Sequence, residues 1–264
     1  MQKTVLMQTR YRIQFPRVGL QDHDQDEAYF YLIEGDRKLK LRLHDYDQIY
    51  LRPGLYEQVV YERLKCSSPR KVGEILDQTL EAVNRPITEL RVLDLGAGNG
   101  AMGAVLKGLG VSRLVGADII PEAKDAAIRD RPDVYDQFYV ADFTHLDADT
   151  KEEIGSWSIN CLTAVAALGF GDIPLKAFSQ ALSFVEIGGW VAFNIKDTFL
   201  DRSDTSGFST FIRELIFSEY LDIHHMEKYR HRLSMEGEPL SYFALAARKT
   251  ADIPADFTER IDNA

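Results

Sequence analysis

Val92-Leu93-Asp94-Leu95-Gly96-Ala97-Gly98-Asn99-Gly100 is the stretch that decides the fold. The apolar residues at positions 92, 93 and 95 are typical of a parallel strand that is buried on both faces. Gly96 and Gly98 can adopt backbone angles closed to other residues, and they let a ligand lie close to the main chain. The segment Gly100 to Gly108 predicts a helix whose positive N-terminus points at whatever the turn holds. A strand, a glycine turn and a helix in this order are typical of a nucleotide site.

A turn of this kind is compatible with two classes of ligand. In dinucleotide-binding proteins a pyrophosphate lies on the helix N-terminus, where a neighbouring carboxylate would be unfavourable. Gly96, Gly98 and Ala101 fit the loose dinucleotide pattern, so the glycines alone do not separate the classes. Asp94, two residues before Gly96, favours a ligand that carries an ammonium group and no phosphate. S-Adenosylmethionine, which joins an adenosine to an amino acid, is such a ligand.

Acidic residues also end the two strands that we expect next. Asp118 follows Leu114 to Ala117 and lies about 20 residues beyond the glycine turn, where a carboxylate can bind the two ribose hydroxyls. Asp142 follows a third strand, Gln137 to Ala141. Three successive strand ends therefore carry a carboxylate.

The segment Asp94 to Gly100 resembles the first motif of the class I S-adenosylmethionine-dependent methyltransferases. The resemblance implies that Asp142 accepts a hydrogen bond from the adenine amino group and that its neighbour Phe143 packs on the ring. Small residues after the fourth strand would let the cofactor approach the backbone. The cofactor site expected on these grounds comprises Asp94, Gly96, Ala97, Gly98, Asn99, Asp118, Ile119, Asp142, Phe143 and Ala164.

The resemblance extends to the rest of the sheet and predicts an α/β fold. That fold is a Rossmann-like seven-stranded methyltransferase sheet, mostly parallel with an antiparallel last strand and helices on both faces. The later elements expected are a fourth strand that runs into a small-residue segment within Trp157 to Leu168, a helix from Pro174 to Phe184, the turn Gly188-Gly189, a fifth strand from Trp190 to Ile195, and a hairpin of Tyr220–Arg230 with Ser241–Arg248.

Within that superfamily, residues 44–248 are most similar to small stand-alone methyltransferases of the Williams-Beuren-region and methyltransferase-like type. The features that carry this similarity are Asp45-Tyr46-Asp47, the strand from Leu162 to Leu168 with Gly169 to Pro174 behind it, and Gly188-Gly189. This similarity brings no particular substrate with it.

In the family that the chain resembles, helices ahead of the glycine turn cover the cofactor and part of the substrate pocket. Alternating polar and apolar residues predict a small β meander within residues 1–45, and the acidic loop 21–27 is expected to be either a solvated loop, a cap over the substrate mouth or a dimer contact. Helices follow at Leu55 to Lys65 and Pro69 to Val83. Tyr46, Tyr50 and Tyr56 are expected either in the core or in the site. The predicted divisions are therefore an extension or cap at 1–45, a catalytic domain at 46–250 and an acidic tail at 251–264.

The charge and composition of the chain restrict the binding partners that we expect for it. The 264 residues include 31 basic and 41 acidic ones, a formal charge of −10, which disfavours a nucleic-acid substrate. The short basic groups Arg37 to Lys40 and Lys228 to Arg232 are expected on solvated strand faces. Cys66 and Cys161 offer neither a disulfide framework nor metal spacing, and no long apolar run predicts a membrane helix. We expect a cytoplasmic protein with no metal, and a homodimer is one of its expected states.

The sequence favours methyl transfer to a small-molecule acceptor. Alternatives are a protein methyltransferase, a non-catalytic S-adenosylmethionine-binding scaffold and, disfavoured by Asp94, a nicotinamide oxidoreductase. A protein substrate would require an open groove in place of a closed lid. Asn194 and Lys196 are expected on the substrate side, and His224-His225 are expected in surface or core roles. No residue is assigned as catalytic.

Overall fold

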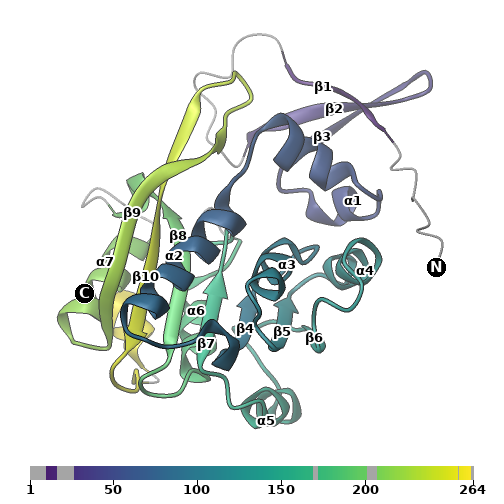
Figure 1. The fold of residues 1–264 in the computed structure, drawn as a ribbon. Coiled ribbons are helices and arrows are strands. Elements are labelled where there is room, and N and C mark those ends of the chain that lie inside the picture. The colour runs from purple at the N-terminus through teal and green to yellow at the C-terminus, as the bar shows by residue number, and fades with distance from the viewer. Residues whose placement is uncertain (1–9, 17–26, 169–171, 201–206, 255, 263–264) are drawn as a thin grey trace.

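A seven-stranded sheet forms the centre of the molecule in a computed structural model that describes residues 10–16, 27–168, 172–200, 207–254 and 256–262 (Figure 1). The strand order is β6-β5-β4-β7-β8-β10-β9. The first five are parallel, and β10, the last strand in the chain, is antiparallel to both of its neighbours. The bounds are β4 (Arg91–Leu95), β5 (Arg113–Asp118), β6 (Gln137–Val140), β7 (Cys161–Ala164), β8 (Trp190–Lys196), β9 (Leu221–Leu233) and β10 (Pro239–Lys249). The predicted fold class is confirmed.

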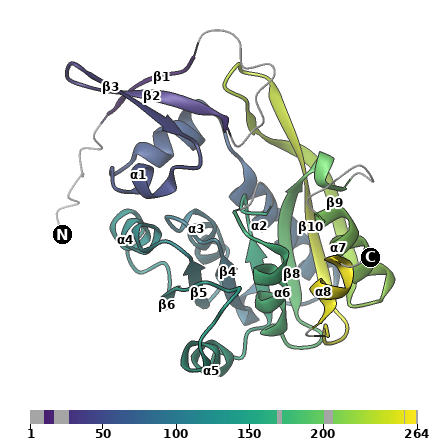
Figure 2. The same cartoon turned by 180° about the vertical axis from the view of Figure 1, so that it is seen from behind.

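Helices cover both faces of this sheet, as Figures 1 and 2 show. One face carries α2 (Ser68–Ala82), α3 (Ala101–Gly108) and α4 (Pro121–Asp130), and the other carries α5 (Ala148–Ser156), α6 (Leu175–Ser183), α7 (Phe208–Phe217) and α8 (Phe257–Asp262). Successive side chains of β4 point to opposite faces of the sheet, so each face has its own core. Val92 packs with α2 and α3 on one face, whereas Leu93 packs with α6 on the other. Two short 3-10 helices, η3 (Ile87–Glu89) and η4 (Asp197–Leu200), complete the connections.

The fourth strand is shorter than predicted. The stretch from Trp157 to Leu168 predicts a strand that runs into a small-residue segment, but Trp157 caps the C-terminus of α5 and only Cys161–Ala164 pair in the sheet. Ala166 then adopts a positive φ of 57°, which turns the chain away. The sequence analysis did not identify α5, because Ile154 is the one buried residue in that polar helix.

The predicted N-terminal meander is present as β1 (Arg12–Gln14), β2 (Tyr29–Glu34) and β3 (Arg37–Arg42), while the acidic loop 21–27 falls almost entirely outside the described residues. The buried face of this meander shares a core with α1 (Tyr46–Tyr50) and the π-helix η2 (Glu57–Arg63). We call described residues 10–16 and 27–64 the cap. Met235, from the β9–β10 hairpin, packs in the same core, so the hairpin contacts the cap as well as extending the sheet (Figure 1).

The basic group Lys228 to Arg232 is not a solvated strand face throughout, contrary to the prediction. Lys228 and Arg230 are exposed, but His231 and Arg232 are both buried. A register shift between Leu240 and Ser241 of β10 leaves an extra residue in β9 at this point. Such a bulge breaks the alternation of a strand and redirects side chains.

The C-terminal segment of the chain contains a helix. The segment predicted as a C-terminal tail includes α8, whose Phe257 is buried against α7. Among the described residues, no helix has the length and apolar character needed to cross a membrane. The boundaries at 45/46 and 250/251 stay predictions.

Candidate functional site

The glycine turn between β4 and α3 lies beneath the cap. Gly98 has a φ of 52°, which favours glycine, and a Cβ added there would lie 2.5 Å from the hydroxyl oxygen of Tyr50. Gly96 is similarly close to the side chains of Ala167 and Ile173. The protein's own packing therefore requires these glycines, in addition to the ligand contact inferred from the sequence.

Asp94 lies in β4 just before the glycine turn, as predicted, and its side chain is bound within the protein. Its carboxylate is buried and accepts hydrogen bonds from the Thr163 hydroxyl on β7 and the Tyr135 hydroxyl before β6, both at 2.6 Å. It is absent from the described lining of the cavity above the turn. Burial raises the pKa of Asp94 to about 6, although the two hydrogen bonds oppose this shift. The carboxylate therefore joins neighbouring segments, and its contact with a ligand ammonium group stays a prediction.

Asp118 is at the position predicted for a ribose ligand. Its carboxylate accepts hydrogen bonds from the Gly98 N–H at 2.9 Å and the Ile120 N–H at 3.2 Å, and it lines the cavity. Burial raises the pKa of Asp118, against the lowering effect of these N–H groups. Because a carboxylate has about four acceptor positions, Asp118 can accept further hydrogen bonds.

The other predicted cofactor residues are divided between the cavity and the core. Gly96, Ala97, Gly98, Asn99, Ile119, Asp142 and Phe143 line the cavity with Asp118. Ile119 is 60% exposed and offers an apolar surface, and Asp142 is half-exposed at the end of β6. Phe143 lines the cavity but is largely buried against Phe184. Ala164 is wholly buried in β7, so Val165, Ala166 and Ala167 provide the small-residue wall that the sequence placed one residue earlier.

The cavity has an acidic and apolar lining. Together with the open space at its mouth it measures about 1080 Å³. Asp118, Asp142 and Asp172 are its acidic residues, and no Lys, Arg or His lies among its described lining residues. This charge distribution suits a ligand with a positive group and is unfavourable for a pyrophosphate.

Tyrosines from the cap form the opposite wall. Tyr46, Tyr50 and Tyr56 line the cavity, and so does Tyr61, which the sequence analysis did not single out. Burial raises the pKa of all four phenols, so they are neutral hydrogen-bonding groups at physiological pH. The cavity is therefore covered by aromatic side chains.

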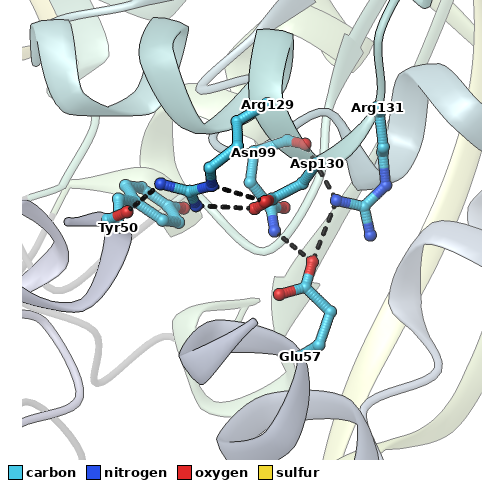
Figure 3. Close-up of polar contacts among 6 residues, drawn as sticks. All are labelled: Tyr50, Glu57, Asn99, Arg129, Asp130 and Arg131. Carbon is cyan, nitrogen blue, oxygen red and sulfur yellow. Dashed lines mark hydrogen bonds and ion pairs between the residues drawn. The ribbon is translucent and has the colours of Figure 1, made fainter. Parts of the chain in front are cut away.

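An ion-pair cluster joins the cap to the glycine turn (Figure 3). Arg131, after α4, donates from one Nη1 atom to Glu57 of the cap at 3.0 Å and to the Asn99 carbonyl at 2.9 Å. The Asn99 side-chain amide donates to the same Glu57 oxygen. Arg129 donates to the Tyr50 carbonyl at 2.8 Å. The sequence analysis missed Glu57, Arg129 and Arg131, because the partners are far apart in the chain and no motif links them.

A buried polar network supports the loop after β7. Asn194 accepts a hydrogen bond from the Ala166 N–H at 2.6 Å and donates to the Tyr229 hydroxyl at 2.8 Å. Ser68 lies 2.6 Å from both the Tyr229 hydroxyl and His231 Nδ1. Asn194 is therefore a buried positioning residue, not a residue exposed to substrate. Lys196 is not among the described residues that line the cavity.

The two adjacent histidines of β9 lie away from the cavity. His224 and His225 on β9 lie near Asp222 and Glu227, at 3.3 and 3.8 Å, and neither lines the cavity. This agrees with the surface or core roles expected for them. No group of metal-binding side chains occurs in the part of the chain that the structure describes.

Comparison with known proteins identifies the fold. No sequence-family model and no curated protein matches the chain. A candidate RNA methyltransferase from Pyrococcus horikoshii is 14% identical, with a TM-score of 0.50 over 69% of this chain and 85% of that chain. A protein from Thermoplasma acidophilum is 16% identical, with a TM-score of 0.50 over 77% of this chain and 97% of that chain. A candidate S-adenosylmethionine-dependent methyltransferase from Listeria monocytogenes is 14% identical, with a TM-score of 0.48 over 69% of this chain and 100% of that chain. Together with the strand order, the two structures with a TM-score of 0.50 show a Rossmann-like methyltransferase fold.

The raised pKa of Asp94 predicts a pH-dependent stability. The folded protein binds a proton on Asp94 up to about pH 6, whereas an exposed aspartate has a pKa of 3.8. The proton that Asp94 binds in the folded state stabilises the fold at low pH. The free energy of unfolding should therefore fall by about 3 kcal/mol as the pH rises from about 4 to above 6. Asp94→Asn cannot titrate, so the stability of the variant relative to wild type should rise by that amount in denaturant titrations. A difference that stays constant with pH contradicts this assignment.

The cluster between cap and turn predicts unequal effects for two glutamates of η2. Glu57→Ala removes two hydrogen bonds made with a charged group and should lower the free energy of unfolding by about 1.5 to 3 kcal/mol. Glu62→Ala is the matched control, because Glu62 pairs with Arg10 on the surface, and it should cost less than about 1 kcal/mol. Urea unfolding measures both, and equal effects would contradict a specific role for Glu57.

Proposed function

We propose that the chain is an S-adenosylmethionine-dependent methyltransferase that acts on a small-molecule acceptor. The observation that carries the proposal is the lining of the cavity above the glycine turn, which has three carboxylates and no basic side chain among its described residues. A cationic, phosphate-free nucleotide suits this surface, and a dinucleotide phosphate does not. The fold is compatible with this activity but does not by itself identify a ligand.

The residues present fit such a cofactor. Asp118 would accept hydrogen bonds from the ribose hydroxyls, while Ile119 and Asp142 would contact the adenine, Ile119 through its exposed side chain and Asp142 by accepting from the amino group. The glycine turn would lie against the amino acid portion. The sulfonium of S-adenosylmethionine supplies an activated methyl group. The protein's part is then to orient the acceptor in line with that group and to exclude water.

The cover over the cavity favours a small acceptor. The cap tyrosines line the cavity opposite the sheet, and the Glu57–Arg131 pair connects the cap to the turn. A protein methyltransferase would be expected to present an open groove, and the formal charge of −10 is unfavourable for a nucleic acid. A scaffold that binds the cofactor without turnover is the remaining alternative.

Substitution of Asp118 tests the cofactor assignment. Asp118→Ala removes the proposed ribose contacts and should weaken S-adenosylhomocysteine binding by about 1.5 to 3 kcal/mol in a calorimetric titration. Asp125→Ala, an exposed acid on α4 outside the cavity lining, is the control and should bind as wild type does. Equal affinities for Asp118→Ala and wild type would contradict the assignment.

Turnover separates an enzyme from a scaffold. Wild-type protein incubated with S-adenosylmethionine and a panel of small acceptors should form S-adenosylhomocysteine, measured by mass spectrometry, above the rate without acceptor. Transfer that occurs with protein acceptors alone would contradict the small-molecule proposal. Cofactor binding without transfer to any acceptor would favour the scaffold.

A further inference from the structure

A second cavity adjoins the first. Tyr46, Tyr56, Ala166 and Asp172 line both, so the two spaces share a wall. The second cavity encloses about 580 Å³ counted out to solvent, and its remaining walls come from the cap, the segment after β7 and the β9–β10 hairpin. A compound in the second cavity would therefore lie next to the site proposed for the cofactor.

The β9 bulge places a charged side chain in this wall. Simple alternation would bury Tyr229 and His231 and expose Arg230 and Arg232. The register shift opposite Leu240 and Ser241 changes that pattern, and Arg232 is only 7% exposed although it is an arginine. Arg232 lines the second cavity, whereas Arg230 remains exposed. The local structure of the hairpin thus directs one guanidinium inward.

Arg232 has no anionic partner in the part of the chain that the structure describes. Its one hydrogen bond there runs from Nη1 to the carbonyl of the next residue, Leu233, at 2.9 Å. The ionisable groups that act on it are Tyr242, Cys66, Tyr46 and Tyr56. Burial raises the pKa of the last three, so they are uncharged at neutral pH. A buried, unpaired charge is costly to stability, and a guanidinium has five N–H donors to satisfy.

The other charged groups of the cavity limit the charge of a ligand. Burial, with a contribution from Arg232, holds the pKa of His231 well below its usual range, so His231 is neutral. Asp172 also lines the cavity, 3.7 Å from His44, and its carboxylate would repel a ligand that carries more than one negative charge. Arg232 is the sole Lys or Arg among the described lining residues, and it can balance one negative charge. A carboxylate matches this charge and the planar fork of a guanidinium.

We propose that Arg232 binds a carboxylate group of the methyl acceptor. This inference rests on the proposed function and specifies its substrate class: a small carboxylic acid whose acid group lies in the second cavity. The rest of the acceptor would then extend past the shared wall of Tyr46, Tyr56 and Ala166 toward the cofactor site. Arg232 would act as a binding and specificity residue, without taking part in the transfer of the methyl group.

Matched acids and amides test this assignment on the full chain saturated with S-adenosylhomocysteine. The pairs are acetate with acetamide, butyrate with butyramide and 4-fluorobenzoate with 4-fluorobenzamide, titrated by ligand-observed NMR. At least one acid should bind wild type about tenfold or more tightly than its amide, as expected for hydrogen bonds between charged groups. Arg232→Met should abolish this preference and Arg232→Lys should retain part of it. Arg230→Met, on the exposed side of the same strand, should leave it unchanged.

Three results would overturn the inference. They are the absence of acid preference in wild type, including failure of every acid to bind; a preference that survives in Arg232→Met; and tighter binding of the dianion phenylphosphonate than of every acid. S-Adenosylhomocysteine titrations of the same proteins separate this from the proposed function, because Arg232 does not line the cofactor cavity and its variants should bind that nucleoside as wild type does.

Discussion

The arrangement of the site depends on the hydrogen bonds that the buried carboxylate of Asp94 accepts. This carboxylate accepts hydrogen bonds from Thr163 on β7 and from Tyr135 ahead of β6, so it ties β4 to segments on both sides. The ring of Tyr135 also occupies the space beside Gly103 of α3. The carboxyl ends of the parallel strands and the start of α3 are thereby held together. Asp118 can then fix the Gly98 N–H at the base of the cavity.

The charge of the cavity surface follows from the same chain segments. Parallel strands bring their carboxyl ends to one edge of the sheet, so Asp118 and Asp142 meet there although they are distant in sequence. The basic residues near this edge are used elsewhere: Arg129 and Arg131 bind the cap and the turn. The acidic cavity would suit the proposed cationic nucleotide, while Arg129 and Arg131 hold the cap beside it.

The sequence predicted the elements that repeat a local pattern and missed those that depend on distant partners. Alternation, glycine turns and strand-end acids located the sheet, the meander and Asp118. Asp94 has the expected position in the chain, but its side chain is satisfied by Tyr135 and Thr163, and neither pairing has a sequence signal. Arg232 looked like an exposed basic residue because a bulge, set by pairing with β10, cannot be inferred from β9 alone.

The measurement that tests the central claim most directly is isothermal titration of the purified chain with S-adenosylhomocysteine, with NADH titrated in parallel. The acidic cavity predicts binding of the former with a dissociation constant on the order of micromolar, about −8 kcal/mol, and no binding of the dinucleotide. Binding of NADH alone, or of neither compound, would contradict the account.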